Sequence, residues 1–361
     1  MPKPVLRGKK PKHEDKVRKA IEQPDPQEFK FTAPSGNFDA MISTGSTLLD
    51  LAVSGYRVKG GGIPSGIIME CFGPPGCGKT ALLVEMIRST QIRGGQAWVL
   101  DPEARMDASY METYGVNIKA EGTNYSRPDT VEQIFDCIRT AIPKRKDVVN
   151  IVAPDSLAAF TTEMGMDGKD KRGQARAKAF SQGMTHVARE IPDKRLVIAC
   201  SNQMRQGEYG DYATGGNAVK FYSSVRIRMK INKVIDKERQ IKKTDPDDPD
   251  SISGTFSKSI GIVTECQVIK NSCDPPYRKA PIVITFGYGI DDIRANLQFN
   301  KDVTSATKYE CTDGKSYVSM FDAVKYVEDK ELEKQVRKRT IKLWYKIQKE
   351  LEVERKPKIR M

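Results

Sequence analysis

The stretch Gly73-Pro74-Pro75-Gly76-Cys77-Gly78-Lys79-Thr80 matches the phosphate-binding pattern G-x-x-x-x-G-K-[ST]. The apolar residues 66–72 before it predict a buried strand, and residues 81–87 after it predict a helix. Its glycines allow the backbone to wrap a phosphate, with N–H groups and the helix N-terminus directed at the anion. All eight residues are therefore predicted to contact a nucleotide.

Two side chains at the end of this stretch carry the expected chemistry. Lys79 is expected to reach the β- and γ-phosphates, and the hydroxyl of Thr80 is expected to bind Mg²⁺. The alternative is a chance match in a glycine-rich turn, and the flanking strand and helix argue against it.

The composition, 38% hydrophobic and 30% charged over 361 residues, is typical of a soluble globular protein. No apolar run is long enough to predict a membrane span or a secretory signal, so we expect a cytoplasmic protein without a membrane partner. The seven cysteines are scattered, which favours reduced packing residues over a disulfide framework. His13 and His186 are the only histidines, which argues against a histidine-based metal site or triad.

The formal net charge of +13 indicates an anionic partner. Residues 1–30 hold nine Lys or Arg against five Asp or Glu, and residues 330–361 hold twelve against five. One explanation of these basic ends is that they keep the protein soluble. Because the chain also has a nucleotide-binding loop, binding of nucleic acid is the better explanation.

Strands and helices alternate through the first two thirds of the chain. After the phosphate-binding stretch we expect strands at 96–100, 148–153 and 195–200 and helices at 128–142 and 173–191. This alternation predicts an α/β fold with a mainly parallel sheet flanked by helices.

Beyond residue 222 the pattern changes. Strands at 223–231, 260–270 and 281–287 are predicted to be antiparallel additions at the sheet edge. The polar insert between the first two of these strands, which contains residues 245–250, is predicted to be an exposed loop. Helices are expected at 321–328 and 330–352.

Three regions follow from these patterns. Residues 1–37 form a basic N-terminal segment and linker, 38–292 the core, and 293–361 a small basic C-terminal domain with a tail.

Polar residues follow three of the predicted strands. Glu103, Asp155 and Gln203 lie where ligands bind in open α/β sheets, beyond the carboxyl ends of the strands. Asp155 fits the second acidic element of a phosphate-loop ATPase, Glu103 fits a general base, and Gln203 fits a γ-phosphate sensor. For Glu103 the alternative is an acid at a helix N-terminus.

The chain resembles the bacterial type of the RecA recombinase family over residues 40–290, and fits a phage-encoded or divergent member. The segments that carry the resemblance, besides the phosphate-binding stretch, are Ser43-Thr44-Gly45-Ser46, Leu100-Asp101-Pro102-Glu103-Ala104, Asp107-Ala108-Ser109-Tyr110, Asp155-Ser156-Leu157, Asn202-Gln203-Met204-Arg205, Thr214-Gly215-Gly216-Asn217 and Val268-Ile269-Lys270-Asn271.

The resemblance implies the remaining roles at the nucleotide. Glu103 would be the hydrolytic glutamate, Asp155 the acid associated with Mg²⁺, and Gln203 the switch between the γ-phosphate and DNA. Tyr110 would stack on the adenine, with Asp107 beside it. Lys270 would reach the phosphates of a neighbouring subunit, although Ser272 stands where many bacterial members have a second basic residue.

The resemblance also implies two DNA-binding loops, at about 163–178 and 204–218, lining a helical filament. Their glycines and cations fit phosphate contacts on physical grounds as well. The residues expected to contact DNA are Lys169, Lys171, Arg172, Arg176, Lys178, Arg205, Gly215, Gly216 and Asn217.

Together these features predict a DNA-dependent ATPase, using ATP and Mg²⁺, that polymerises on single-stranded DNA and promotes homologous pairing and strand exchange with double-stranded DNA. The N-terminal segment is expected to contact the next subunit. The alternatives are a hexameric DNA helicase or repair ATPase, a small-molecule kinase, and a structural filament without catalysis.

Overall fold

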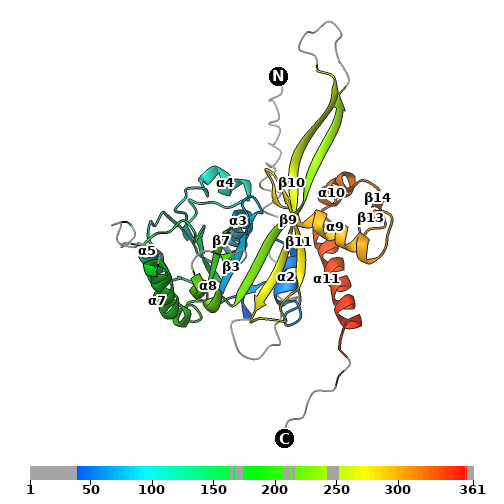
Figure 1. Cartoon of the computed structure of the whole chain (residues 1–361). Helices are drawn as coiled ribbons and strands as arrows, with labels where there is room; N and C mark the ends of the chain where they lie inside the picture. Colours follow the sequence, from blue (N-terminus) through cyan, green and yellow to red (C-terminus); the bar gives the residue numbers. More distant parts are fainter. Residues whose placement is uncertain are drawn as a thin grey trace, which may run out of the picture.

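The computed structural model describes residues 39–162, 166, 174–205, 212–213, 216–241, 252–353 and 355. Among these residues the main sheet has the strand order β12-β11-β10-β9-β3-β7-β6-β4-β5, with β8 paired to β7 beside this path. Figure 1 shows this sheet in the body of the molecule, with the paired strands β9 and β10 extending well beyond it.

The first half of the sheet is parallel, as predicted. Its strands are β3 (Ile68–Gly73), β4 (Ala97–Leu100), β5 (Thr123–Ser126), β6 (Asn150–Pro154) and β7 (Leu196–Arg205). All residues of β3 are buried, because the strand lies between β7 and β9 at the centre of the sheet.

Helices cover both faces of this parallel half. Successive residues of a strand point to opposite faces, and Met69 packs in the cluster that contains α3 (Lys79–Ile92), whereas Ile68 packs in the cluster that contains α5 (Val131–Thr140) and α7 (Gln174–Glu190). The predicted α/β class, with a mainly parallel sheet between layers of helices, is confirmed.

The second half of the sheet consists of β9 (Val225–Ile241), β10 (Gly254–Asn271), β11 (Lys279–Thr285) and β12 (Gly289–Ile290). Pairing from β9 to β12 is antiparallel, as expected, but β9 itself runs parallel to β3. The predicted strand ends were also wrong, since ten residues at the end of β9 and six at the start of β10 belong to the insert that was predicted to be a loop. Those residues are mostly polar and exposed, and the sequence prediction treated polarity alone as a loop signal.

The remaining elements complete the core and the C-terminal part. They are β1 (Met41–Ile42), α2 (Thr47–Ser54), β2 (Ile63–Pro64), α4 (Ala108–Thr113), β8 (Tyr212–Ala213), α8 (Gly216–Tyr222), α9 (Asp292–Val303), β13 (Tyr309–Glu310), β14 (Ser316–Tyr317), α10 (Met320–Asp329) and α11 (Glu333–Glu350).

The C-terminal part has a small apolar cluster of its own, formed around Leu297, Val327 and Val336. Helix α11 also contacts the core, because the hydroxyl of Tyr345 donates to the carbonyl of Gly55, 2.6 Å away, at the end of α2. The expected N-terminal segment lies outside the described residues, and the three-region division remains a prediction.

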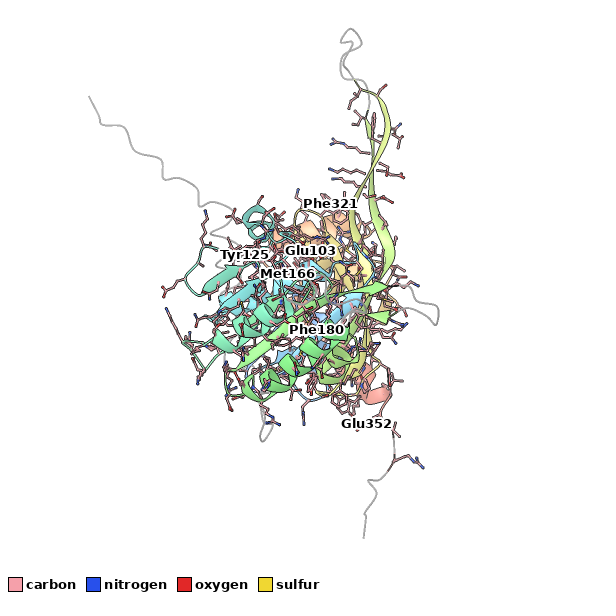
Figure 2. All side chains as sticks on the ribbon, turned by 60° about the vertical axis from the view of Figure 1, so that its left-hand side comes forward. Glu103, Tyr125, Met166, Phe180, Phe321 and Glu352 are labelled. Carbon is pink, nitrogen blue, oxygen red and sulfur yellow. The ribbon has the colours of Figure 1, made fainter. Side chains whose placement is uncertain are left out.

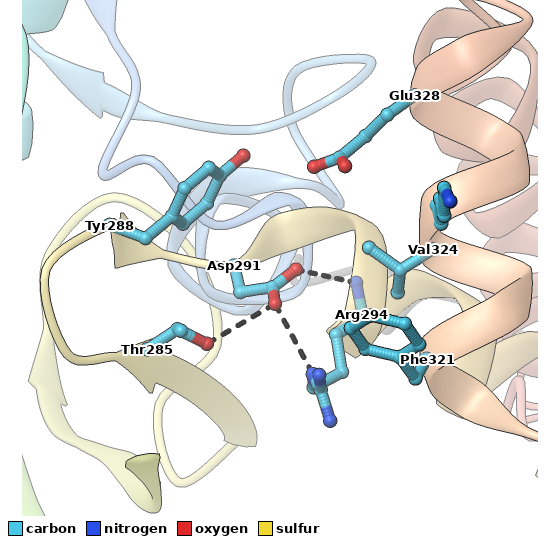
Figure 3. Close-up of a pocket in the computed structure, with 8 residues that line it drawn as sticks. Thr285, Tyr288, Asp291, Arg294, Phe321, Val324 and Glu328 are labelled. Carbon is cyan, nitrogen blue, oxygen red and sulfur yellow. Dashed lines mark hydrogen bonds and ion pairs between the residues drawn. The ribbon is translucent and has the colours of Figure 1, made fainter. Parts of the chain in front are cut away.

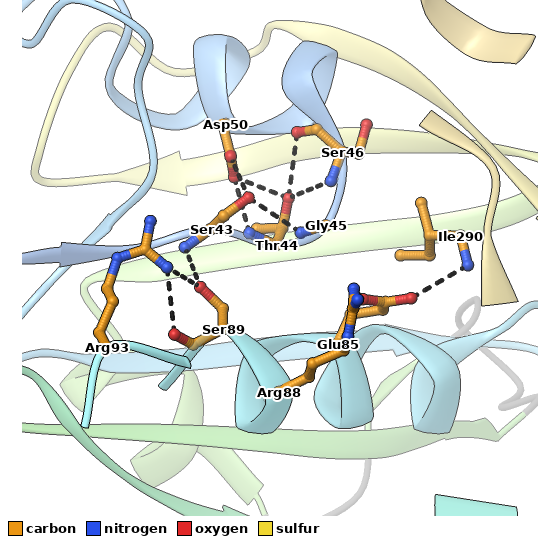
Figure 4. A network of polar contacts seen from close by, with 10 residues as sticks. All are labelled: Ser43, Thr44, Gly45, Ser46, Asp50, Glu85, Arg88, Ser89, Arg93 and Ile290. Carbon is orange, nitrogen blue, oxygen red and sulfur yellow. Dashed lines mark hydrogen bonds and ion pairs between the residues drawn. The ribbon is translucent and has the colours of Figure 1, made fainter. Parts of the chain in front are cut away.

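A buried polar network fastens the start of the core to helix α3 (Figure 4). The carboxylate of Asp50 accepts hydrogen bonds from the hydroxyls of Ser43 and Thr44 at 2.5 and 2.8 Å, and the backbone N–H of Ser43 donates to Ser89 of α3 at 2.9 Å. Ser46 caps α2 by accepting from the N–H of Leu49. The quoted Ser43–Ser46 segment therefore positions the helix that follows the phosphate loop.

Within the part of the chain that the structure describes, no helix is both long and apolar enough to cross a membrane. The seven cysteines are free thiols, and Cys137 is the most exposed of them while the other six are buried.

Candidate functional site

The phosphate loop connects the end of β3 to the first residue of α3. Gly76 and Gly78 have φ values of +73° and +91°, which glycine adopts without steric cost. A Cβ atom on Gly78 would lie 2.1 Å from the side chain of Ile284, whereas one on Gly76 would meet no atom within 4 Å. The loop is thus packed against β11 on one side and has room beside Gly76 on the other.

Lys79 folds back over this loop. Its ammonium group donates to the carbonyls of Gly73 and Pro74 at 3.0 and 2.8 Å. Cys77 is fully buried behind it, and burial raises the pKa of the Cys77 thiol. Lys79 therefore spans the loop, while Cys77 serves as a packing residue.

The two residues predicted to hold Mg²⁺ are in direct contact. The hydroxyl of Thr80 donates to Oδ2 of Asp155 at 2.6 Å, and Ser201 donates to the other carboxylate oxygen. Asp155 is only 5% exposed, and burial raises its pKa while these two hydrogen bonds oppose the rise. The fold thus joins the start of α3 to the end of β6.

These donors suit Mg²⁺. Among the described residues there is no group of three or more His, Cys, Asp or Glu side chains that could bind a metal by itself. Mg²⁺ in nucleotide sites commonly takes one or two protein oxygens and completes its shell with phosphates and water. A hydroxyl and a carboxylate beside a phosphate loop fit that demand.

Glu103 lies at the same edge of the sheet, after β4. Its Oε1 accepts a hydrogen bond from the hydroxyl of Ser156 at 3.3 Å, next to Asp155 in the sequence. Its Oε2 lies 2.5 Å from the guanidinium of Arg105, in an ion pair that lacks hydrogen-bond alignment. The Glu103 side chain is 18% exposed although its Oε2 is buried, so both contacts orient a mostly buried carboxylate at this edge.

Gln203 lies directly beside the phosphate loop. In the parallel pairing of β3 with β7, Gln203 is in register with Gly73, the first glycine of the loop. The backbone N–H of Gln203 donates to the side-chain oxygen of Asn202 at 3.0 Å. The predicted sensor is therefore adjacent to the predicted phosphate site.

A buried ion pair supports this region. The amide of Asn202 donates to one carboxylate oxygen of Glu70 at 2.8 Å, and Arg226 Nε lies 2.5 Å from the other. Glu70 is fully buried in β3, and the Arg226 guanidinium lies 4.7 Å from the ring centroid of Phe72. The sequence prediction missed Glu70, although an acid inside an apolar strand was a signal for such a pair.

Asp107 and Tyr110 have structural contacts of their own. Asp107 caps α4 by accepting from the N–H of Tyr110 at 2.8 Å. The Tyr110 hydroxyl donates to Tyr114 at 3.1 Å, the two ring centroids are 5.0 Å apart, and burial raises the pKa of Tyr110. Their contact with adenine stays a prediction.

Lys270 is engaged within its own chain. Its ammonium group donates to the carbonyls of Lys220 and Phe221 at 2.9 and 2.7 Å, near the C-terminal end of α8. Burial, together with nearby Arg226, lowers the pKa of Lys270. Its predicted reach to a neighbouring subunit stays a prediction.

The predicted DNA-binding residues fall into two groups. Lys169, Lys171, Arg172 and Gly215 lie outside the described residues.

The others lie at the ends of regular elements. Arg176 and exposed Lys178 are in the first turns of α7, where Arg176 donates to the carbonyl of Leu157. Arg205 ends β7, and Gly216 and Asn217 begin α8. Both predicted loops are therefore shorter than expected at these ends, and contact with DNA remains a prediction.

The structure also has a pocket of about 230 Å³ between the β11–α9 segment and α10 (Figure 3). Within it Asp291 accepts hydrogen bonds from Thr285 and from Arg294, at 3.3 and 3.2 Å. Its residues belong to neither the phosphate loop nor the strand ends with the predicted site residues. We assign this pocket no part in nucleotide chemistry.

A buried central strand, a glycine loop and the N-terminus of a helix, set in a parallel sheet with helices on both faces, define a phosphate-loop nucleotide-binding fold. Residues 35–291 match the family model described as the RecA N-terminal domain. The chain belongs to the RecA family.

Curated relatives agree with this assignment. Protein RecA of Borrelia hermsii is 32% identical over 313 residues, which cover 83% of this chain and 81% of that protein. Protein RecA of Trichodesmium erythraeum is 33% identical over 259 residues, covering 70% and 64% respectively. Protein RecA of Synechococcus sp. is 34% identical over 268 residues, covering 72% and 64%.

Proposed function

We propose that this protein is a DNA-dependent ATPase that assembles on single-stranded DNA and promotes homologous pairing and strand exchange. The observation that carries the proposal is the register of Gly73 with Gln203 in adjacent parallel strands. One strand leads into the phosphate loop and the other into segment 204–218, so a change at the nucleotide has a direct route to the proposed DNA loop. The relationship to proteins named RecA supports the same activity.

In this proposal the loop residues bind the nucleotide. The backbone around Gly76 and the N-terminus of α3 surround the phosphates, and Lys79 exchanges its bonds to loop carbonyls for the β- and γ-phosphate oxygens. Thr80 and Asp155 would hold Mg²⁺, which when bound neutralises negative charge on the phosphates.

Glu103 is the proposed general base. Its contacts with Ser156 and Arg105 orient the carboxylate, which accepts a proton from the attacking water. Gln203 then reports the loss of the γ-phosphate to the segment that follows it. Lys270 would contact the nucleotide of the next subunit in a helical filament, and the cytoplasmic location stays a prediction.

The test is ATP turnover with and without single-stranded DNA. We expect DNA to stimulate hydrolysis in the full chain, and we expect Glu103→Gln to lower kcat about 10²- to 10⁴-fold while nucleotide binding is retained. The matched control is Glu121→Gln, which removes a carboxylate whose side chain is 89% exposed and paired with Lys144 at 3.0 Å; it should behave as the unmodified chain.

Other outcomes would select the alternatives. Hydrolysis that DNA does not change would reject the proposal, and equal turnover in Glu103→Gln would favour a structural filament. Closed rings in electron micrographs, in place of open filaments on single-stranded DNA, would favour a helicase.

A further inference from the structure

The outer part of the β9–β10 hairpin extends beyond the body of the protein. We call residues 236–241 of β9 and 254–259 of β10 the distal ribbon. Figure 2 shows most of it standing clear of the rest of the molecule with side chains on both of its faces. All of its residues except half-buried Ile241 are exposed. A two-stranded ribbon without a third layer is only marginally stable in water, which suggests that this one has a partner.

The sequence separates the charges of this ribbon by face. Asp236-Lys237-Glu238-Arg239 alternates in sign, and alternate residues of a strand point to opposite faces. The register places Lys237 opposite Lys258, and Arg239 opposite Phe256. We call the face formed by these four residues the cationic face; it holds three positive charges and an aromatic ring that is 46% exposed.

The acids lie on the other face. Asp236 is opposite Ser259, whose hydroxyl donates to its carboxylate at 2.7 Å, and Glu238 is opposite Ser257. The alternation thus places the acids on the face opposite Lys237, Arg239 and Lys258, and the ribbon as a whole holds three cations against two acids.

The cationic face is not arranged for the stability of the hairpin itself. Like charges directly opposite each other on paired strands are destabilising, and Lys237 and Lys258 form such a pair. Lys237 is held at the base of the ribbon, with its ammonium 5.3 Å from the ring centroid of Phe321 in α10. The repulsion would be relieved by an anion bound along this face.

We propose that the cationic face of the distal ribbon binds the phosphate backbone of duplex DNA. A two-stranded β-ribbon fits the major groove of B-DNA, and lysine and arginine contacts to phosphates need no further pocket. Single-stranded DNA is a poorer match, because its binding relies on successive aromatic platforms in a groove and this face has one aromatic ring. The choice of DNA as the partner rests on the proposed function. The residues of the cationic face, however, belong neither to the predicted DNA-binding loops nor to the nucleotide site.

The test is the salt dependence of binding of the full chain to a short duplex. Arg239→Gln combined with Lys258→Gln should weaken duplex binding and reduce the slope of log K against log salt by about 2, one for each lost phosphate contact. The control, Lys119→Gln with Lys308→Gln, removes the same charge from exposed lysines elsewhere and should leave the slope unchanged.

Three results would overturn the proposal that the cationic face binds duplex DNA. An unchanged slope in the ribbon variant, or an equal fall in the control, overturns the proposal. Altered self-association by light scattering without a change of slope would point to a second copy of the chain as the partner and would also overturn it. The ribbon variant should keep its DNA-stimulated ATP hydrolysis, so a failure of the proposed function would appear separately, in the unmodified chain.

Discussion

Strands β9 and β10 behave as two different structures along their length. Near the body, Ile227, Met229, Cys266 and Val268 are completely buried, because β3 and β11 extend the sheet and α3 covers it. Farther out the same backbone ladder continues through the distal ribbon, where the side chains face water. Pairing register therefore sets where residues lie, whereas burial supplies the free energy that holds them there.

The two parts also use charge in opposite ways. In the buried part Arg226 forms an ion pair with Glu70 at 2.5 Å, so that each buried charge is neutralised by the other. In the distal ribbon Lys237 is opposite Lys258 and the nearby acids are on the other face. Three measurements test how burial governs the effect of charge in this protein.

The largest effect is expected at the buried pair. Glu70→Ala leaves Arg226 buried without the anion that it pairs with and removes the carboxylate that accepts from the Asn202 amide, and should lower the free energy of unfolding by about 3–5 kcal/mol in urea denaturation. Glu265→Ala is the control, since it breaks an exposed pair with Lys279 in the same part of the sheet, with side chains 40% and 56% exposed. Its expected cost is about 0–1 kcal/mol, and equal losses in the two variants would contradict the contrast.

A second measurement concerns a buried acid on α3. Burial raises the pKa of Glu85 from 4.5 to about 7, with Arg88 at 3.7 Å opposing the rise. Between these two values the folded chain holds a proton that the unfolded chain has lost, so the contribution of Glu85 to stability falls as pH rises.

Glu85→Gln should therefore gain stability relative to the unmodified chain as pH rises from 4.5 to above 7. The gain should be about 3 kcal/mol, because one pKa unit corresponds to about 1.4 kcal/mol. Urea denaturation of both proteins across this range measures the difference, and a difference that does not vary with pH would contradict the burial argument.

The smallest expected effect is a gain of stability, in the distal ribbon. Lys258→Thr removes the repulsion with Lys237 and adds a β-branched residue, so the distal ribbon should gain about 0.2–1 kcal/mol of local stability. Hydrogen exchange of the ribbon amides should slow, with global unfolding nearly unchanged. Faster exchange would mean that the lysine pair is not a source of strain.

The sequence was sufficient for the parts of the site that depend on local patterns. A buried strand, a glycine loop and a helix follow from residues 66–87, and the order of Glu103, Asp155 and Gln203 after apolar strands predicts one shared edge. The contact of Thr80 with Asp155 and the register of Gly73 with Gln203 agree with that edge.

Features set by distant partners were beyond sequence reasoning. The helices α4, α8 and α9 were missed because they are short or weakly patterned, and their positions depend on packing. The role of Glu70 needs Asn202 and Arg226, which are more than a hundred residues away in the chain. The ends of β9 and β10 depend on each other, since neither outer strand has an apolar face of its own.

Helix α11 is tied to the core by both burial and charge. Val336, Thr340 and Trp344 are buried, and burial raises the pKa values of Asp50 and Asp292 while Arg337 of this helix opposes the rise. The basic helix therefore packs against the core, and its outer lysines have fixed positions relative to the phosphate loop. A truncation before α11 would remove Arg337 from beside the buried carboxylates of Asp50 and Asp292, in addition to removing the basic surface of the helix. The role of that surface is therefore better tested by single lysine substitutions.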